Sequence, residues 1–344
     1  LVKAYEMDVN IKFTPISAEM YSNWVAMQGK NRYIITLLGR ILTAEQIAAV
    51  SRIIADQNLN IDNMIRLTGR IPLDEKQRAA KSCVELSVRG SLADRNKMQQ
   101  SFLELSSKLN FDISFQEESM YRRMRRLICF DMDSTLIQTE VIDELAERAG
   151  VGDKVKAITE SAMHGDIDFE ESFKQRIKLL KGLDASVLKE VAENLPITEG
   201  LGRLMKVLQK VGFKTAILSG GFTYFGNYLK DKYGFDYMYA NELEIVDGKL
   251  TGNYLGDIIT GKKKAELLSL IAQVEKIDIR QTVAVGDGAN DLPMLGIAGL
   301  GIAFHAKPKV KQNAGQSLSS VGIDGILYFL GYKDSMLDSE MLKG

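Results

Sequence analysis

The run Leu127-Ile128-Cys129-Phe130-Asp131-Met132-Asp133-Ser134-Thr135 decides the fold of the larger part of this chain. Its first four residues are all apolar, which is typical of a strand buried on both faces. Similar apolar runs follow at residues 215–218, 282–285 and 299–304, with helical stretches between them. Short apolar strands that alternate with helices predict an α/β fold, a doubly wound parallel sheet covered by helices on both faces.

Acidic residues directly follow two of these strands. Asp131 and Asp133 come after the first, and Asp287 and Asp291 come after the strand at 282–285. Carboxylates this close repel one another unless a cation neutralises them. Because the carboxyl ends of parallel strands meet on one side of a sheet, the two pairs predict one shared metal, and oxygen ligands favour Mg²⁺. The alternative for each pair is a solvated turn, in which Asp is common.

The strand at 215–218 leads into Ser219-Gly220-Gly221. A hydroxyl and free backbone N–H groups at a strand end suit phosphate oxygens. No histidine is placed to activate Ser219, so we interpret it as a phosphate ligand rather than a nucleophile.

Two apolar helical stripes between Thr135 and Ser219 predict a helical cap over the site, at about residues 140–197. Arg176 shares the apolar stripe of the second helix, where a guanidinium needs a partner. Two interpretations stay open: an internal salt bridge or snorkelling side chain, and a clamp for a substrate carboxylate.

The N-terminal part reads β-α-β-β-α-β over residues 34–115, with Thr43 and Asp94 as helix caps, a ferredoxin-like α+β arrangement. We assign this domain to residues 31–120. Residues 1–30, with a strand-like run at 10–13 and a helical one at 18–28, are interpreted as the remnant of a preceding domain. The basic run at 121–126 (YRRMRR) is expected to be a mobile, solvated link rather than a nucleic-acid patch.

Composition excludes several classes of protein. The net charge of -1 gives no electrostatic argument for nucleic acid or a membrane surface. The sequence has no apolar run of about 18 residues and no signal-peptide pattern, so we expect a cytoplasmic protein. Cys83 and Cys129 are predicted to be reduced core residues, and His164 and His305 are too few for a zinc site or a Ser-His-Asp triad.

The strand-end motifs together resemble the haloacid dehalogenase superfamily over a domain at residues 124–335. This resemblance implies that Asp131 is the nucleophile, that Asp133 is the general acid and base, and that Asp133 also gives a main-chain carbonyl to the metal. It further implies that Asp287 is a metal ligand, with Asp291 supporting the site. The family's lysine should precede the helix at 265–274, where the choice lies between Lys264, favoured by spacing, and Lys262.

Within that superfamily, residues 131–150 (DMDSTLIQTEVIDELAERAG), 170–173 with Arg176, 218–222 and 285–291 resemble the phosphoserine phosphatases. The resemblance implies Mg²⁺-dependent hydrolysis of O-phospho-L-serine through an aspartyl-phosphate, the last step of serine biosynthesis. It implies that Glu140 binds the substrate ammonium and Arg176 its carboxylate. The other substrate-binding residues that it implies are Met163, Phe169, Ser219, Gly220, Lys264 and Asn290.

The order of the N-terminal elements, with Gly39 at the first strand-to-helix turn, resembles the ACT domain. This resemblance implies an amino-acid effector and a homodimer; the alternative is a scaffold that binds no ligand. For the whole chain two other functions stay open. One is a phosphotransferase, or a phosphatase for another small phosphomonoester, and the other is a serine-sensing regulatory protein.

Overall fold

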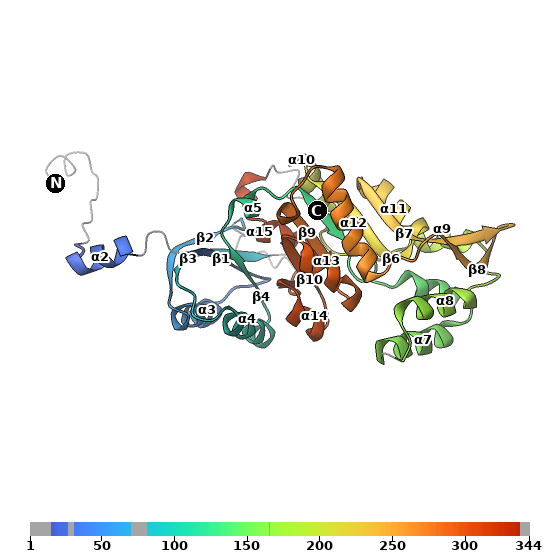
Figure 1. The fold of residues 1–344 in the computed structure, drawn as a ribbon, viewed down its shortest axis with the longest axis horizontal. Helices are drawn as coiled ribbons and strands as arrows, with labels where there is room; N and C mark the ends of the chain where they lie inside the picture. The colour runs from blue at the N-terminus through green and yellow to red at the C-terminus, as the bar shows by residue number, and fades with distance from the viewer. Residues whose placement is uncertain (1–14, 27–30, 70–80, 165, 338–344) are drawn as a thin grey trace, which may run out of the picture.

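The computed structural model describes residues 15–26, 31–69, 81–164 and 166–337. The strand expected at 10–13 lies outside these residues. The helix expected at 18–28 is α2 (Ala18–Ala26), which lies apart from the body of the molecule in Figure 1. Nowhere in the described ranges is a helix long and apolar enough to cross a membrane.

The N-terminal domain has the predicted β-α-β-β-α-β order. Its strands form an antiparallel sheet with the order β2-β3-β1-β4. Thr43 and Gln46 form a reciprocal capping box at the start of the first helix, because each side chain accepts the other residue's backbone N–H. Both helices bury apolar faces against one face of the sheet. The elements are β1 (Arg32–Gly39), α3 (Ala44–Asp56), β2 (Leu59–Arg66), β3 (Ser82–Gly90), α4 (Arg95–Leu109) and β4 (Asp112–Glu117).

The larger domain contains a seven-stranded sheet with the order β11-β10-β9-β5-β6-β7-β8. All pairs from β11 to β7 are parallel, and β8 runs antiparallel to β7. The four predicted strands are confirmed as β5, β6, β9 and β10. The strands are β5 (Leu127–Phe130), β6 (Lys214–Phe222), β7 (Tyr237–Val246), β8 (Lys249–Leu255), β9 (Thr282–Gly286), β10 (Leu300–Phe304) and β11 (Gln316–Leu318).

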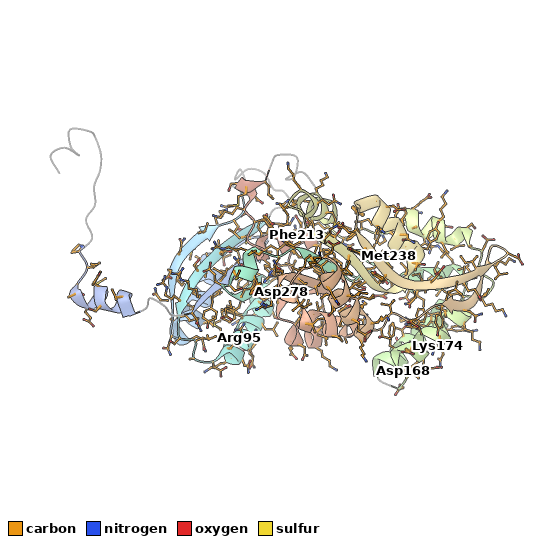
Figure 2. All side chains as sticks on the ribbon, turned by 45° about the horizontal axis from the view of Figure 1, so that its top comes forward. Arg95, Asp168, Lys174, Phe213, Met238 and Asp278 are labelled. Carbon is orange, nitrogen blue, oxygen red and sulfur yellow. The ribbon has the colours of Figure 1, made fainter. Side chains whose placement is uncertain are left out.

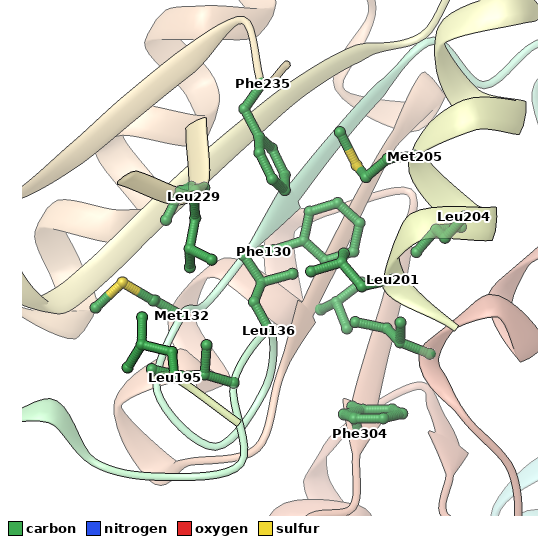
Figure 3. Packing of buried hydrophobic residues seen from close by; sticks show 14 of the residues in the cluster. Phe130, Met132, Leu136, Leu195, Leu201, Leu204, Met205, Leu229, Phe235 and Phe304 are labelled. Carbon is green, nitrogen blue, oxygen red and sulfur yellow. The ribbon is translucent and has the colours of Figure 1, made fainter. Parts of the chain in front are cut away.

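Helices cover both faces of this sheet. Phe130 of β5 packs into one apolar core with residues of α10 and α11, as Figure 3 shows around Phe130, Leu201 and Leu229. Its neighbour Cys129 packs into the opposite core with α12 and α13. Burial on both faces explains why the strand is apolar throughout. The covering helices are α10 (Leu201–Lys210), α11 (Thr223–Tyr233), α12 (Gly261–Val274), α13 (Leu292–Ile297), α14 (Pro308–Asn313) and α15 (Ile326–Phe329).

The predicted helical cap is formed by α6 (Val141–Arg148), α7 (Gly152–His164), α8 (Phe169–Leu179) and α9 (Ser186–Glu193). In Figure 2, Lys174 of α8 and its N-cap Asp168 lie at the lower right, and Arg95 of α4 lies left of centre. The β7–β8 hairpin, which we did not predict, supports the cap: Gly182 N–H donates to the Leu250 carbonyl at 2.8 Å, and the rings of Phe173 and Tyr254 lie 5.7 Å apart.

The two domains meet along a seam between β4 and β11. The amide of Gln316 bonds both backbone groups of Phe115, at 2.7 Å from the N–H and 2.8 Å from the carbonyl. The Asp112 carboxylate accepts the N–H groups of Ser319 and Ser320 at 2.7 and 2.8 Å. Leu38 and Cys83 of the first domain also belong to a buried cluster of the second. Both cysteines are free and buried, as predicted.

The link at residues 121–126 is solvated only in part. It overlaps α5 (Met120–Arg123); Arg123 and Arg126 are exposed as expected, but Arg122 and Arg125 are only 4% and 9% exposed. Arg122 pairs with Glu85 at 2.7 Å, and Arg125 donates to Gln116 at 3.2 Å. The burial of these two arginines was missed because their partners belong to strands of the first domain, and a local charge run cannot reveal them.

Candidate active site

Three parallel strands bring the predicted site residues to one side of the sheet. β5 lies between β6 and β9, so Asp131 and Asp287, which directly follow β5 and β9, lie near Ser219 in the carboxyl-terminal half of β6. The backbone N–H of Asp131 continues the ladder and donates to the Val285 carbonyl at 2.9 Å. The convergence that we inferred from the strand ends is therefore present in the fold.

Asp131, Asp287 and Asp291 form an acidic cluster. One carboxylate oxygen of each lies within 4.8 Å of those of the other two. Burial raises the pKa of Asp131 well above its usual range, and it raises the pKa of Asp287 to about 7, with the charge of Asp291 as the next cause. Carboxyl groups that resist ionisation together, and that offer only oxygen atoms, fit a hard divalent cation such as Mg²⁺.

One lysine enters this cluster. The fully buried Nζ of Lys264 lies 2.7 Å from Asp131 Oδ1 and 2.7 Å from Asp291 Oδ1. Lys262 is 88% exposed and faces Glu266 instead. Of the two lysines considered from the sequence, only Lys264 reaches the strand ends.

The expected start of the lysine helix needs a correction. The helix begins at Gly261 rather than at residue 265, because the Thr260 hydroxyl caps it by accepting the Lys263 N–H at 3.3 Å. The lysines therefore occupy its first turn, where successive side chains point about 100° apart and only one can face inward.

Asp133 connects the nucleophile strand to the cap. Its Oδ1 accepts the N–H of Val141, the first residue of α6, at 2.9 Å, and its Oδ2 lies 3.5 Å from the Ser219 hydroxyl. Burial, followed by the charge of Glu140, raises the pKa of Asp133 to about 8. A carboxyl group that is protonated near neutral pH can give a proton to a leaving group.

The segment Ser219-Gly220-Gly221 leaves no room for a side chain at Gly221. The Ser219 hydroxyl accepts the Gly221 N–H at 2.8 Å. A Cβ added to Gly221 would lie 2.4 Å from Asp133 Oδ2 and 2.7 Å from Met132 Cε. The glycine at this position is therefore required for backbone to approach the Asp133 carboxyl.

A cavity of about 900 Å³ lies between the strand ends and the cap. Glu140 and Arg176 both line it from the cap side, and burial is the main perturbation at each: it raises the pKa of Glu140 and lowers that of Arg176. Arg176 Nε donates to the Ser172 carbonyl of its own helix at 3.3 Å. The other predicted residues on the cavity wall are Asp131, Asp133, Phe169, Gly220, Asp287 and Asn290.

Three predicted residues lie off this wall, and some wall residues were not predicted. Ser219 contacts Asp133, Lys264 contacts Asp131, and Asp291 contacts Lys264. The side chain of Met163 is not among those that the structure describes. Lys307 and Lys309 line the cavity but were missed. They follow β10, so the strand-end argument applied to the acids would also have found them.

Thr135 was also missed as a partner of the acidic cluster. Its buried hydroxyl donates to Asp287 Oδ1 at 3.2 Å. This contact joins the strand ends of β5 and β9 and orients one of the cluster's carboxylates.

Comparison with known proteins gives a consistent result. The family described as haloacid dehalogenase-like hydrolase matches residues 128–296, and an ACT domain family matches residues 32–116. Phosphoserine phosphatase of Streptomyces coelicolor is 40% identical over 304 residues, which are 88% of this chain and 72% of that protein. The enzyme of Haemophilus influenzae is 46% identical over 233 residues, 68% of this chain and 74% of that protein.

Solved structures agree with the sequence comparison. An unliganded probable phosphoserine phosphatase from Vibrio cholerae has a TM-score of 0.67 and 36% identity, covering 87% of this chain and 86% of that one. A substrate-bound phosphoserine phosphatase complex has a TM-score of 0.57 and 43% identity, covering 60% of this chain and 98% of that one.

Proposed function

Because the chain belongs to the phosphoserine phosphatases, a family of haloacid dehalogenase-like hydrolases, we propose that it converts O-phospho-L-serine to serine and phosphate in the cavity above Asp131. The observation that carries the proposal is the arrangement of charge around this cavity. A buried acid-lysine cluster lies at one end, and an acidic and a basic side chain, Glu140 and Arg176, lie on the cap.

The two ends of the cavity match the two ends of phosphoserine. Glu140 would pair with the α-ammonium group, and the Arg176 guanidinium would bind the α-carboxylate through two parallel hydrogen bonds. The phosphate would then lie over Asp131, within reach of the Ser219 turn and Lys264. A substrate that carries an ammonium, a carboxylate and a phosphate group would use all of these groups together.

In the first chemical step, an oxygen of Asp131 would attack phosphorus while the bond from phosphorus to the seryl oxygen breaks. The protonated carboxyl of Asp133 would give its proton to that oxygen, which leaves as serine. In the second step, the Asp133 carboxylate would take a proton from water as the water oxygen attacks phosphorus. This step releases phosphate and regenerates Asp131, so a difficult hydrolysis is divided into two easier steps.

Charge repulsion is the main obstacle to this reaction, because a phosphate dianion must approach a carboxylate. Lys264 offsets part of it at 2.7 Å from Asp131. Mg²⁺ held by Asp131, Asp287 and the Asp133 main-chain carbonyl, with Asp291 in support, would supply the remaining positive charge. The raised pKa values of Asp131 and Asp287 in the absence of metal support this assignment.

Phosphate release from a panel of phosphorylated metabolites, with and without Mg²⁺, tests the function. We expect phosphoserine to be the best substrate, metal to be required, and Asp131→Asn to lose turnover while the exposed Asp153→Asn retains it. Turnover by Asp131→Asn near the wild-type rate would refute the mechanism. Adding an acceptor alcohol separates hydrolysis from phosphoryl transfer, since transfer would yield a new phosphate ester.

The Arg176 assignment has its own test. Arg176→Ala should raise KM for phosphoserine about tenfold or more, because it removes a charge-assisted contact to the carboxylate. Phosphoethanolamine, which keeps the ammonium group but lacks the carboxylate, should show little change. Equal effects on both substrates would eliminate the clamp and favour a purely structural arginine.

Two further expectations concern the ACT domain. We propose that it binds an amino-acid effector and that the chain forms a homodimer; the match to the ACT family supports both. Calorimetric titration of the full chain with serine, and measurement of its mass in solution, test them separately.

A further inference from the structure

Asn241 occupies a place in the fold where backbone pairing fails. β6 and β7 pair Leu218 with Tyr239, but the next pair is Phe222 with Asn241. Three residues of β6, Ser219, Gly220 and Gly221, therefore lie between these pairs, opposite one residue of β7. A bulge of this kind leaves backbone groups without ladder partners, and Asn241, which is 1% exposed, lies beside them.

The amide nitrogen of Asn241 replaces one missing partner. Nδ2 donates to the Gly220 carbonyl at 2.8 Å. In a trans peptide the carbonyl and the following N–H point in opposite directions. Because Asn241 holds the Gly220 carbonyl, the Gly221 N–H is directed the other way, where it donates to Ser219 Oγ at 2.8 Å beside the cavity.

The amide oxygen of Asn241 reaches a second part of the site. Oδ1 accepts the backbone N–H of Ile259 at 2.8 Å. Ile259 directly precedes Thr260, the N-cap of α12, and the first turn of α12 carries Lys264. One buried amide therefore fixes both the Ser219 turn and the start of the lysine helix.

We propose that Asn241 is a positioning residue for phosphoryl transfer. Through its hydrogen bonds to Gly220 and Ile259, it fixes the position of Ser219 relative to Lys264. This inference rests on the proposed function, which assigns both elements to the phosphate. The competing explanation is that Asn241 only satisfies buried polar groups and contributes to stability. The two explanations differ in what happens to phosphate affinity in the folded protein.

Asn241→Leu keeps the approximate shape of the side chain and removes both hydrogen bonds. We expect kcat/KM for phosphoserine to fall about 100-fold, the loss typical of a misplacement of about 1 Å. Inorganic phosphate, titrated calorimetrically into the Mg²⁺-loaded protein, should bind about tenfold more weakly, the scale of one lost hydrogen bond to a charged group. Asn241→Asp keeps the acceptor for Ile259 and, when ionised, cannot donate to Gly220, so it should also lose phosphate affinity at pH values above the pKa of the new carboxyl group.

Thr215→Val is the matched control. The Thr215 hydroxyl also makes two hydrogen bonds, both with Asp236, the residue before β7. These bonds join β6 to β7 at the other end of the strands. Thr215→Val should lower the melting temperature and leave phosphate affinity unchanged. Wild-type phosphate affinity in Asn241→Leu or Asn241→Asp would overturn the proposal, as would an equal loss in Thr215→Val.

The readout also separates this inference from the proposed function. If the wild-type protein binds inorganic phosphate but does not turn over phosphoserine, the assigned substrate is wrong. The phosphate affinities of the three variants then still decide the role of Asn241.

Discussion

Lys264 is the residue on which the geometry of the acidic cluster depends. Its ammonium group is completely buried and contacts two carboxylates at 2.7 Å. Without Lys264, these two carboxylates and Asp287 would repel one another in a poorly solvated site. Removal of the lysine from the buried ion pairs would leave its carboxylate partners without a compensating charge. The lysine therefore serves both the fold around the strand ends and the proposed chemistry.

Lys264→Met should lower kcat at least 100-fold, the loss typical of removing one preorganised group that stabilises transition-state charge. Lys262→Met is the control, since its side chain is exposed on the same helical turn, and it should stay within about twofold of wild type because surface ion pairs contribute little. Initial rates at saturating phosphoserine, with melting temperatures to confirm folding, provide the measurement. A large loss in Lys262→Met would reverse the assignment.

Metal affinity should depend on pH because the free carboxyl groups hold protons. Burial raises the pKa of Asp287 to about 7 and that of Asp131 well above its usual range. Mg²⁺ must displace these protons, so its affinity should fall as pH decreases through 7 and rise above it. Calorimetric titration in buffers of different ionisation enthalpy should reveal proton release near pH 7. An affinity that is constant from pH 6 to 8 would contradict this.

The Asp287 carboxyl group also makes the stability of the metal-free protein depend on pH. Because the pKa of Asp287 is higher in the folded than in the unfolded chain, the unfolded chain loses this proton first as pH rises. The contribution of this group to stability is therefore greatest below about pH 4 and is lost as pH rises to about 7. Bound Mg²⁺ should reverse this loss.

Individual site residues were predictable from sequence where a positional rule applied. The acids and Ser219 follow apolar strands, and strand ends in parallel sheets converge. The choice of Lys264 was not derivable from composition, because it depends on the rotational phase of a helix whose start was misplaced. Arg125 was beyond local reasoning, since its partner Gln116 belongs to another domain.

At the scale of elements, the β7–β8 hairpin is the part that sequence reasoning overlooked. A signal was present: Val246-Asp247-Gly248-Lys249 is an Asp-Gly turn, with φ of 49° at Asp247 and 74° at Gly248. Such turns join two strands directly. The hairpin also holds the cap, because Ala185 N–H donates to the Gly248 carbonyl at 2.8 Å.

Gly248→Val should lower the free energy of unfolding by about 1–2 kcal/mol, the cost of placing a side-chain-bearing residue in the left-handed region. The cost comes from the backbone alone, since an added Cβ at Gly248 meets nothing within 4 Å. Gly296→Ala in α13, which also has open space, should not destabilise the protein. Urea unfolding followed by circular dichroism measures both; equal stabilities would show that the turn is unstrained.

At the scale of the molecule, the two domains behave as parts of one structure. Leu38 and Cys83 of the first domain pack in the core of the second, and the seam is completed by polar contacts from Asp112 and Gln316. Arg203 adds buried ion pairs to Asp324 and Asp334 at 2.8 Å, and Lys81 of the first domain meets Asp324 at 2.7 Å. The order and type of the elements were predictable in the first domain, and in the second the strands β5, β6, β9 and β10 and the helical cap were predictable. This seam was not, because it joins residues some 200 positions apart.

Thermal unfolding should therefore show a single transition, with calorimetric and van't Hoff enthalpies in agreement. Gln316→Ala removes the hydrogen-bond partner of both the N–H and the carbonyl of Phe115, so it should shift that transition to lower temperature. The neighbouring Gln312→Ala, at an exposed position, should not. If Gln316→Ala moved one of two separate transitions, the domains would be independent.

The contact between β4 and β11 also has a protective consequence. Each is the outermost strand of its sheet, and unpaired strand edges recruit other chains into aggregates. Here the edges shield each other through the side chains of Gln316 and Asp112. Either domain produced alone would expose an unpaired edge strand that can bind other chains. To stay soluble without its partner domain, it would need new charged residues or prolines in that strand.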